Sequence, residues 1–189
     1  MDAGLVLASD AVPIAPTATT EDLYGTLSQR GPGLVLGVLG RLGEALAAGR
    51  AQDESLVTRA RKLWRADAWF DPAGDADSAR RRINALSPWP GVSATLAGAE
   101  LKLLRADALP DPPGRPAHRP GSLVDPAGGL FACGSGLLRI LEAQPAGSKP
   151  MSWGALINGR AIPEGSALVP IAGPPPEARG ASPPGAPSR

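Results

Sequence analysis

One segment of the chain interleaves basic and aromatic side chains, a combination that proteins use to contact nucleic acid. The basic residues are Arg59, Arg61, Lys62 and Arg65, and the aromatic residues are Trp64, Trp69 and Phe70. Cationic side chains pair with phosphates, and aromatic rings stack on bases. The alternative is a solvated linker that its tryptophans attach to a neighbouring domain. Because tryptophan is usually buried, we expect Trp64 and Trp69 to pack.

The residue counts exclude several other chemistries. Cys133 is the only cysteine and His118 is the only histidine, which rules out disulfide scaffolds, cysteine-based zinc sites and multi-histidine metal sites. His118 lies in a proline-rich loop, residues 109–120, with no acidic or nucleophilic side chain adjacent in sequence. We therefore expect no metal site, and no catalytic role for His118.

The formal net charge of +1 conceals an asymmetry along the chain. Residues 1–58 carry three basic and seven acidic side chains, a net charge of −4, while residues 59–189 hold the remaining 16 basic and 11 acidic ones, a net charge of +5. The basic second part indicates an anionic partner, although a charge of this size is also common on solvated surfaces.

Length and composition set broad limits on the kind of protein. A chain of 189 residues suits one domain, or one domain plus a piece of another. The start of the chain lacks the basic segment of a signal peptide, and no apolar run is long enough to cross a bilayer. We expect a cytoplasmic protein that does not contact membranes.

The elements expected before the basic segment are helical. Val6, Leu7 and residues 12–14 suit the ends of strands, but they lack the neighbours that a sheet needs. Thr19 or Thr20 is expected to cap a helix that residues 31–33, Gly-Pro-Gly, interrupt. A second helix then carries an apolar stripe from Leu34 to Leu46 and ends near Gly49. This stripe is stronger than the segment can bury by itself, so an element is missing from its inner side.

A sharp junction follows the basic segment. Asp77 is expected to cap a short helix over residues 78–86, with Ala79, Ile83 and Leu86 facing inward. The sequence Ser-Pro-Trp-Pro-Gly, residues 87–91, bars a helix from continuing, and we expect Trp89 to pack at this hinge. Alternating apolar and polar residues around Gly98 then predict a β-hairpin.

The remainder of the chain predicts short strands separated by turns. They are expected at residues 121–124, 130–133, 137–143 and 167–171, with a small helix that Ser152 caps. Several short strands with one small helix indicate a small barrel of the OB type. Residues 172–189 are rich in proline and glycine, and we expect them to be disordered.

Several blocks of sequence, taken in order, resemble the C-terminal portion of methionyl-tRNA formyltransferase. They are INALSPWPG, LAGAELKLLRAD, PGSLV, GLFACGSGLLRILEAQPAGSKPMS and LINGR. QDESLVTRARKL resembles the interdomain region of that family, and VPIAPTATTEDLYGTL resembles the end of its catalytic domain. The resemblance covers roughly residues 1–170. It implies an α+β chain: a remnant of an α/β, Rossmann-like formyltransferase domain, then an OB-like β-barrel and a disordered tail.

This resemblance implies four segments. Residues 1–49 are the remnant of the catalytic domain and residues 50–76 are a basic linker. Residues 77–171 are a C-terminal OB-like tRNA-binding domain with its leading helix, and residues 172–189 are the tail.

The same resemblance implies transfer of a formyl group from 10-formyltetrahydrofolate to methionyl initiator tRNA. The family's catalytic domain binds the folate and holds an Asn, a His and an Asp. In one alignment, without a gap, Asp2-Ala3-Gly4 matches the family's DxG motif, and Asp2 stands at the catalytic Asp. A second alignment, with a small deletion after Leu5, places Asp2 upstream of the catalytic Asp. With no residue before Met1, the folate pocket, the Asn and the His are expected to be absent. We therefore expect the chain alone to be inactive.

The linker and C-terminal domain of the family offer basic side chains to the tRNA backbone. By resemblance these are Arg59, Arg61, Lys62, Arg65, Lys102, Arg105, Lys149 and Arg160. Such contacts supply affinity and weaken steeply with salt. Alternation along a strand places Lys102 and Arg105 on opposite faces unless a bulge intervenes.

Three other interpretations stay open. The chain is a free-standing tRNA-binding module, or it is half of a two-chain enzyme whose missing N-terminal domain covers the apolar stripe in trans. In the plainest alternative, it is a soluble barrel whose basic residues are only solvated.

Overall fold

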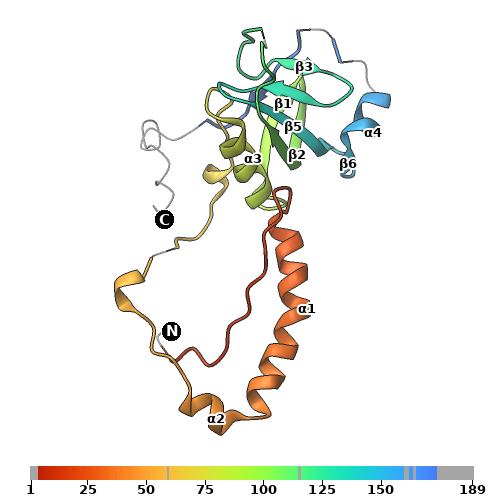
Figure 1. The fold of residues 1–189 in the computed structure, drawn as a ribbon. Helices are drawn as coiled ribbons and strands as arrows, with labels where there is room; N and C mark the ends of the chain where they lie inside the picture. Colours follow the sequence, from red (N-terminus) through yellow and green to blue (C-terminus); the bar gives the residue numbers. More distant parts are fainter. Residues whose placement is uncertain (1–3, 59, 115, 160–161, 164, 174–189) are drawn as a thin grey trace.

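The two longest described strands pair antiparallel in the middle of a curled sheet (Figure 1). The structure, a computed structural model, describes residues 4–58, 60–114, 116–159, 162–163 and 165–173. In this part of the chain the sheet has seven strands: β1 (Val92–Leu96), β2 (Ala99–Leu109), β3 (Leu123–Asp125), β4 (Leu130–Ala132), β5 (Leu137–Pro145), β6 (Met151–Ser152) and β7 (Leu168–Pro170). Their order is β3-β4-β5-β2-β1-β7, with β6 paired to β5. The hairpin and the short strands expected after residue 91 form, as a curled antiparallel half-barrel.

The two edges of the sheet meet at one point. The Leu123 amide donates to the Ser166 carbonyl at 2.9 Å, and the Leu168 amide donates to the Gly121 carbonyl at 2.7 Å. Gly121 has a φ of +87°, and a Cβ there would lie 2.8 Å from the Leu168 carbonyl oxygen. Glycine therefore lets the β3 and β7 edges approach, and the sheet curls back on itself.

The hairpin around Gly98 forms as the alternation predicts. Ala97 and Gly98 both have positive φ and make a two-residue turn between β1 and β2. Val92, Ala94 and Leu96 turn inward from β1, and Leu101 and Leu103 turn inward from β2. The local pattern is sufficient here because the turn sets the register and one face of the hairpin is apolar.

The helix α3 (Ala76–Ala85) covers the inner face of this sheet. Asp75 caps it by accepting a hydrogen bond from the Ser78 amide at 2.8 Å, so the expected cap at Asp77 is wrong by two residues. Asp77 instead pairs with Arg80 and Arg81 inside the first turns. Ala79, Ile83 and Leu86 are buried, as expected.

The far side of the core is closed by α4 (Trp153–Asn158), which Ser152 caps as expected. The Trp153 ring meets Phe131 edge-on, with ring centroids 5.5 Å apart, and its indole N–H donates to the Pro126 carbonyl at 2.7 Å. A buried tryptophan requires such a partner for its polar atom. We call α3, β1–β7 and α4 together the sheet domain.

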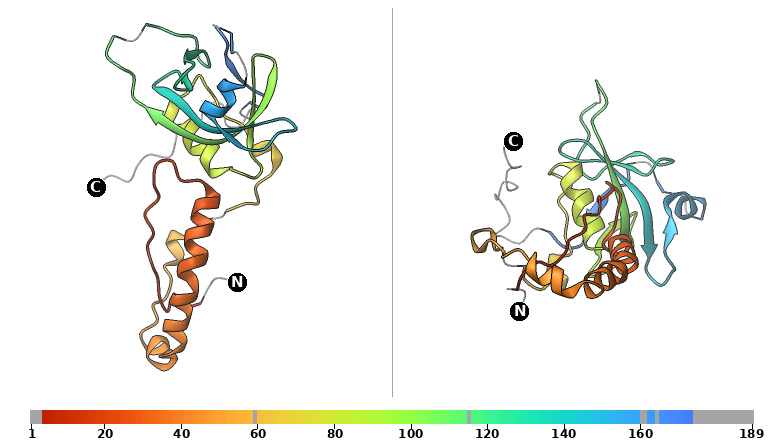
Figure 2. Two further views of the ribbon diagram at one scale, coloured as in Figure 1. Left: turned by 90° about the vertical axis from the view of Figure 1, so that its right-hand side faces the viewer. Right: turned by 60° about the horizontal axis from the view of Figure 1, so that its bottom comes forward.

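Before the sheet domain, α1 (Thr20–Leu39) and α2 (Leu42–Ala47) form a projection that we call the arm (Figures 1 and 2). The expected interruption at residues 31–33 is wrong, because α1 runs through Pro32. The ring of a proline clashes with the Cβ of the preceding residue in a helix, and Gly31 has none. The expected cap forms at Thr19: its hydroxyl accepts from the Asp22 amide and its amide donates to the Asp22 carboxylate, which makes a capping box.

The segment that leads into α1 runs along the arm towards the sheet domain (Figure 2). Val6 and Arg50 share two backbone hydrogen bonds of 2.9 and 3.1 Å, an isolated bridge. Residues 12–14 form no strand, so the expectation of strand ends there is wrong. Two short 3-10 helices follow the arm, η1 (Glu54–Leu56) and η2 (Arg65–Asp67). Among the described helices, none has the length and apolar character needed to span a bilayer.

Candidate nucleic-acid interface

The basic side chains of the linker differ in whether they are already paired. Arg61 makes a two-bond ion pair with the Asp67 carboxylate, and this hydrogen bonding lowers the pKa of Asp67 from 3.8 to about 2. Lys62 and Arg65 are exposed and make no ion pair with the described residues. Lys62 and Arg65 are thus the predicted tRNA-binding cations of the linker that are free to meet an anion, among those that the structure describes.

The 3-10 helix η2 is anchored to α3 by Arg82. The Arg82 guanidinium donates to the Trp69 carbonyl at 2.8 Å and to the Asp67 carbonyl at 2.7 Å. It also lies 3.6 Å from the centroid of the Trp69 ring. Burial lowers the pKa of Arg82. Phe70, one residue further on, is buried in the core. Arg82 and Phe70 therefore hold η2 against α3, and η2 carries Arg65.

The two linker tryptophans behave differently. Trp69 packs under Arg82, as expected. The expectation that Trp64 packs is wrong, because 63% of its surface is exposed. The Trp64 amide donates to the Asp67 carboxylate at 2.7 Å, so its backbone starts η2 while its ring lies outside.

A bulge in β2 determines on which face of the strand the Lys102 and Arg105 side chains lie. The pairing of β2 with β5 shifts register between Leu103 and Ala106, and both Leu103 and Leu104 are buried. The extra residue brings Lys102 and Arg105 to the same, outer face of the strand. Both line one recess together with Glu21 and Glu142.

Arg105 is held by groups from the start of α1. It donates to the Asp22 carboxylate at 2.6 and 3.1 Å and to the Thr17 carbonyl at 2.8 Å, while Glu142 lies 3.7 Å away. The Arg105 hydrogen bonds, with those from Thr19, hold the pKa of Asp22 well below its usual range. Arg105 therefore joins the arm to β2, and its contact with tRNA stays a prediction.

Three further bonds tie the arm and the segment just before it to α3. The Thr20 hydroxyl donates to the Ala85 carbonyl at 2.6 Å, and Arg80 donates to the Pro16 carbonyl. Asn84 contacts the same carbonyl at 3.4 Å and bonds both backbone groups of Ala106, at 2.8 and 2.9 Å. The buried Asn84 amide thus joins α3 to β2 beside the foot of the arm.

Of the remaining predicted site residues, the structure describes Lys149. Lys149 is exposed in the turn after β5. Asp2, Arg59 and Arg160 lie outside the described residues, as does the tail from residue 174, where the sequence predicts disorder.

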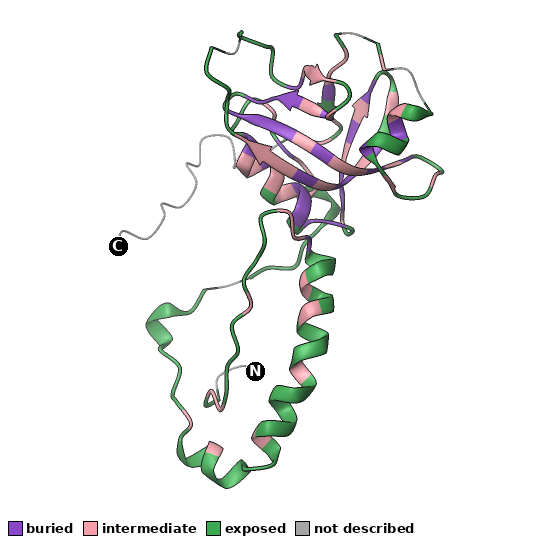
Figure 3. Cartoon of the chain, turned by 45° about the vertical axis from the view of Figure 1, so that its right-hand side comes forward, coloured by how far each residue is buried: buried purple, intermediate pink, exposed green. Residues whose placement is uncertain are grey.

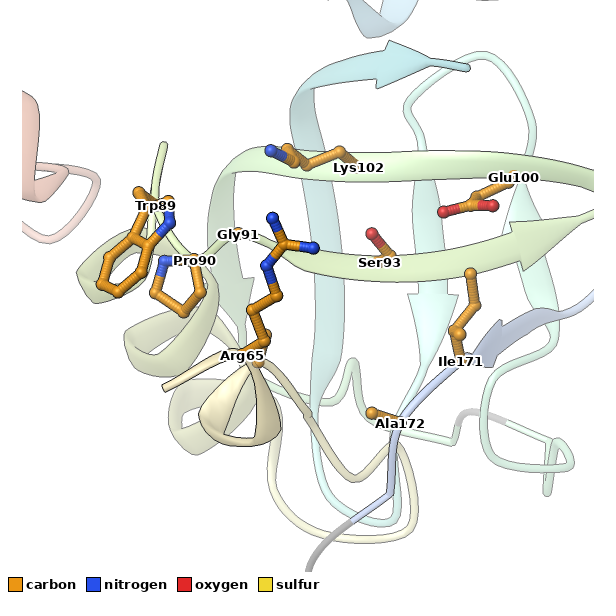
Figure 4. A pocket seen from close by; sticks show the side chains of 10 residues that line it. Arg65, Trp89, Pro90, Gly91, Ser93, Glu100, Lys102, Ile171 and Ala172 are labelled. Atoms are coloured by element: carbon orange, nitrogen blue, oxygen red, sulfur yellow. The ribbon is translucent and has the colours of Figure 1, made fainter. Parts of the chain in front are cut away.

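The structure also exposes a group that sequence reasoning missed. The expectation that Trp89 packs at the hinge is wrong, since 58% of its surface is exposed. Trp89 stands at the rim of a recess of about 490 Å³ that Arg65 and Lys102 also line (Figure 4). These three residues come from η2, the Pro-Trp-Pro turn and β2. The only signal in the sequence was that Trp89 lies between two prolines.

Formyl transfer as the resemblance implies it needs an Asn and a His beside an Asp. His118 is exposed in its loop, Asn158 is exposed at the end of α4, and Asn84 is committed to Ala106. The described residues therefore do not supply the Asn, His and Asp set that the resemblance assigns to formyl transfer from 10-formyltetrahydrofolate. Within the same residues, no group of three or more His, Cys, Asp or Glu side chains is placed to hold a metal ion.

Comparison with known proteins identifies the fold and its relatives. Residues 62–161 match the model of the family described as formyl transferase, C-terminal domain. A methionyl-tRNA formyltransferase of Thiobacillus denitrificans is 36% identical over 170 residues, which are 89% of this chain and 54% of that protein. One from Methylococcus capsulatus is 37% identical over 86% of this chain and 52% of its own length, and one from Cereibacter sphaeroides is 38% identical over 88% and 52%.

A solved structure agrees at the level of the fold. A variant of HypX from Aquifex aeolicus superimposes with a TM-score of 0.53 at 18% identity, covering 86% of this chain and 29% of that one. The chain spans about half the length of the curated relatives that it matches. Because the family model covers more than half of the 189 residues, the chain belongs to the formyl transferase C-terminal domain family, and its sequence resembles the C-terminal portion of methionyl-tRNA formyltransferase.

Proposed function

We propose that this chain supplies the tRNA-holding portion of a methionyl-tRNA formyltransferase in the cytoplasm. The observation that carries the proposal is the similarity of 85–90% of the chain to proteins of that name, at 35–38% identity. The formyl donor, 10-formyltetrahydrofolate, and the groups that move protons then belong to the part of the relatives that these residues do not match. The substrate held here is initiator methionyl-tRNA.

The free cations support this role. Lys62, Arg65 and Lys149 are exposed, and Lys102 makes only a 3.5 Å contact with the Pro88 carbonyl. Such side chains bind an anionic surface, and each contact with a phosphate increases the salt dependence of binding. Arg61 and Arg105 have to leave Asp67 and Asp22 before they can contribute, so we rank them below the other four. Arg59 and Arg160 complete the proposed set.

The exposed apolar residues of the arm favour a chain that works together with a catalytic half of the enzyme. They argue against a free-standing tRNA-binding module. Leu34, Val35, Leu36, Leu39 and Leu46 are all exposed, although the sheet domain buries residues of the same kind. A face of this character normally contacts another protein surface. We propose that the arm packs on the catalytic half, whether that half is part of the same chain or of another one.

The experiment combines this chain with the catalytic half of a relative. Formyl-methionyl-tRNA is measured for the 189-residue chain alone, for the N-terminal half of the Thiobacillus denitrificans enzyme alone, and for the mixture. We expect formylation only in the mixture. Formylation by the 189-residue chain alone, or a mixture no more active than the N-terminal half alone, would contradict the proposal.

Two variants separate the parts of the proposal. Replacing Leu36 and Leu39 by serine should abolish formylation of methionyl-tRNA by the mixture. It should leave tRNA binding by the chain unchanged, because both side chains lie on the arm. Replacing Lys62 and Lys149 by glutamine should weaken tRNA binding and reduce its salt slope by about two charges. Replacing Arg81 by glutamine is the control for the loss of one positive charge away from the proposed site, since Arg81 pairs with Asp77 on α3.

A further inference from the structure

A recess lies between η2 and the start of the β1–β2 hairpin, with a volume of about 490 Å³ (Figure 4). Trp89 and Pro90 form one end of it and Glu100 and Ile171 the other, while Arg65 rises from η2 below and Lys102 lies across from β2 above. The recess thus has an aromatic rim, two positive charges beside that rim, and a carboxylate at the opposite end.

Both cations are held in place without an acidic partner. The Arg65 side chain makes no hydrogen bond or ion pair with the described residues, and η2 is anchored by the bonds from Arg82 to Asp67 and Trp69. Lys102 passes close over Gly91, where a Cβ would lie 2.8 Å from the Lys102 Cδ. Its ammonium group makes the long contact with the Pro88 carbonyl. These two charges are therefore available for an anion at the Trp89 end.

Trp89 offers a flat aromatic surface beside those charges. The chain holds four tryptophans, of which Trp153 is buried and Trp69 is covered by Arg82. Trp89 and Trp64 are the exposed ones, and of these two only Trp89 lines the recess. Base–aromatic stacking with a nearby cation on the phosphate is the way in which proteins hold unpaired nucleotides. Paired bases are stacked on each other inside a duplex, so their faces cannot reach the indole.

We propose that this recess binds one unpaired nucleotide of RNA, with its base on the Trp89 indole and its phosphate between Arg65 and Lys102. The choice of RNA rests on the proposed function. The site deepens that function, because it selects single-stranded segments of the tRNA over paired ones. Glu100 keeps further phosphates away from the far end, which limits the recess to one nucleotide.

The test uses the 189-residue chain with two probes, fluorescein-labelled hexaadenylate RNA and a short blunt-ended RNA duplex. Binding is followed by fluorescence anisotropy at about 50 mM and about 200 mM salt. Trp89→Leu should weaken hexaadenylate binding about tenfold and leave its salt slope unchanged, because stacking involves no counterion. Arg65→Gln and Lys102→Gln should weaken binding and reduce the slope by about one charge each. Binding of the duplex should change less than twofold in Trp89→Leu.

Trp64→Leu is the matched control, since Trp64 is as exposed as Trp89 but lies outside the recess. It should bind hexaadenylate like the original chain. Thermal unfolding of each variant checks that the fold is intact, and Arg65→Gln tests the recess independently of the Pro-Trp-Pro turn. Wild-type affinity in Trp89→Leu, equal losses in both tryptophan variants, or no binding of hexaadenylate at low salt would overturn the proposal.

The outcome separates this proposal from the proposed function. If the mixture with the catalytic half formylates tRNA while hexaadenylate binding does not depend on Trp89, the recess is not a nucleotide site and the function stands. If hexaadenylate binding depends on Trp89 while the mixture never formylates tRNA, the recess is an RNA site and the formyltransferase role is wrong.

Discussion

The arm and the sheet domain contain similar apolar residues, but only the sheet domain covers them. No residue of α1 or α2 is buried, while Ile83 of α3 and Leu103 of β2 are fully inaccessible to solvent (Figure 3). Both regions have regular secondary structure, and α1 and α3 each begin with a side-chain cap, so local order is not what distinguishes them. The sheet domain draws its stability from its own packing. The arm holds its position through polar contacts at one end, and its apolar face is available to a partner.

The largest expected difference between the two regions concerns side-chain truncation. Ile83→Ala should lower the free energy of unfolding by about 3 kcal/mol, because it leaves a cavity in the packed core. Leu36→Ala, with the side chain 68% exposed, should change it by less than about 0.5 kcal/mol. Urea unfolding of both variants provides the measurement. Equal losses would mean that the arm is buried in solution.

The second prediction concerns the polar link between α3 and β2. Asn84→Ala should cost about 1–3 kcal/mol, because the buried backbone groups of Ala106 lose their partner. Asn158→Ala, at the exposed end of α4, is the control and should have little effect. The same urea titration compares them. A neutral Asn84→Ala variant would show that Ala106 finds other partners and that the amide does not hold the two elements together.

The third prediction concerns the foot of the arm. Asp22→Asn removes the ion pair with Arg105, which is partly exposed, so the global stability should fall by less than about 1 kcal/mol. Amide hydrogen exchange in the first turn of α1 should nevertheless become faster, because the capping carboxylate is also lost. Asp10→Asn is the control, since Asp10 pairs with Arg30 on the arm itself. Unchanged amide exchange at residues 20–24 would show that the Asp22 contacts do not stabilise the first turn of α1.

The smallest expected effect is a titration in the linker. The pKa of Asp67 is lowered from 3.8 to about 2, chiefly by the hydrogen bonds from Arg61. A carboxylate whose pKa is lower in the folded state stabilises the fold above its unfolded pKa. That contribution is lost as the pH falls through the folded value, here between about 3.8 and about 2. Arg61→Gln should move the Asp67 midpoint, measured by carboxyl NMR, back towards 3.8. Arg81→Gln should leave it in place.

Much of the sheet domain could be predicted from local patterns. The β1–β2 hairpin, the strands after Gly121, the cap at Ser152 and the inward face of α3 all follow from alternation, turn residues and capping chemistry. The pattern was less reliable where two local signals competed. Proline at residue 32 indicated a break, but Gly31 relieved the clash, and Asp75 outcompeted Asp77 as the cap because it lies at the true start of the helix.

The candidate interface was predicted only in part, because its parts are distant in sequence. The basic residues could be named from the sequence, but it could not show that Arg105 pairs with an aspartate 83 residues earlier or that Arg61 pairs with Asp67. It also assigned Trp64 and Trp89 to packing on the average behaviour of tryptophan. Whether a ring is buried depends on which element lies over it, and periodicity along one segment contains no such information.

The sequence by itself determined the family, the order of the strands along the chain, and the segment where cations and aromatic residues gather. These properties depend on residues within a few positions of each other, where backbone geometry and turn chemistry decide the outcome. Only the tertiary structure decided which cations are free, how the bulge turns Lys102 and Arg105 to one face, and that Arg65, Trp89 and Lys102 share a recess. Those outcomes depend on contacts between separate elements, which form only when the sheet curls and its core excludes water.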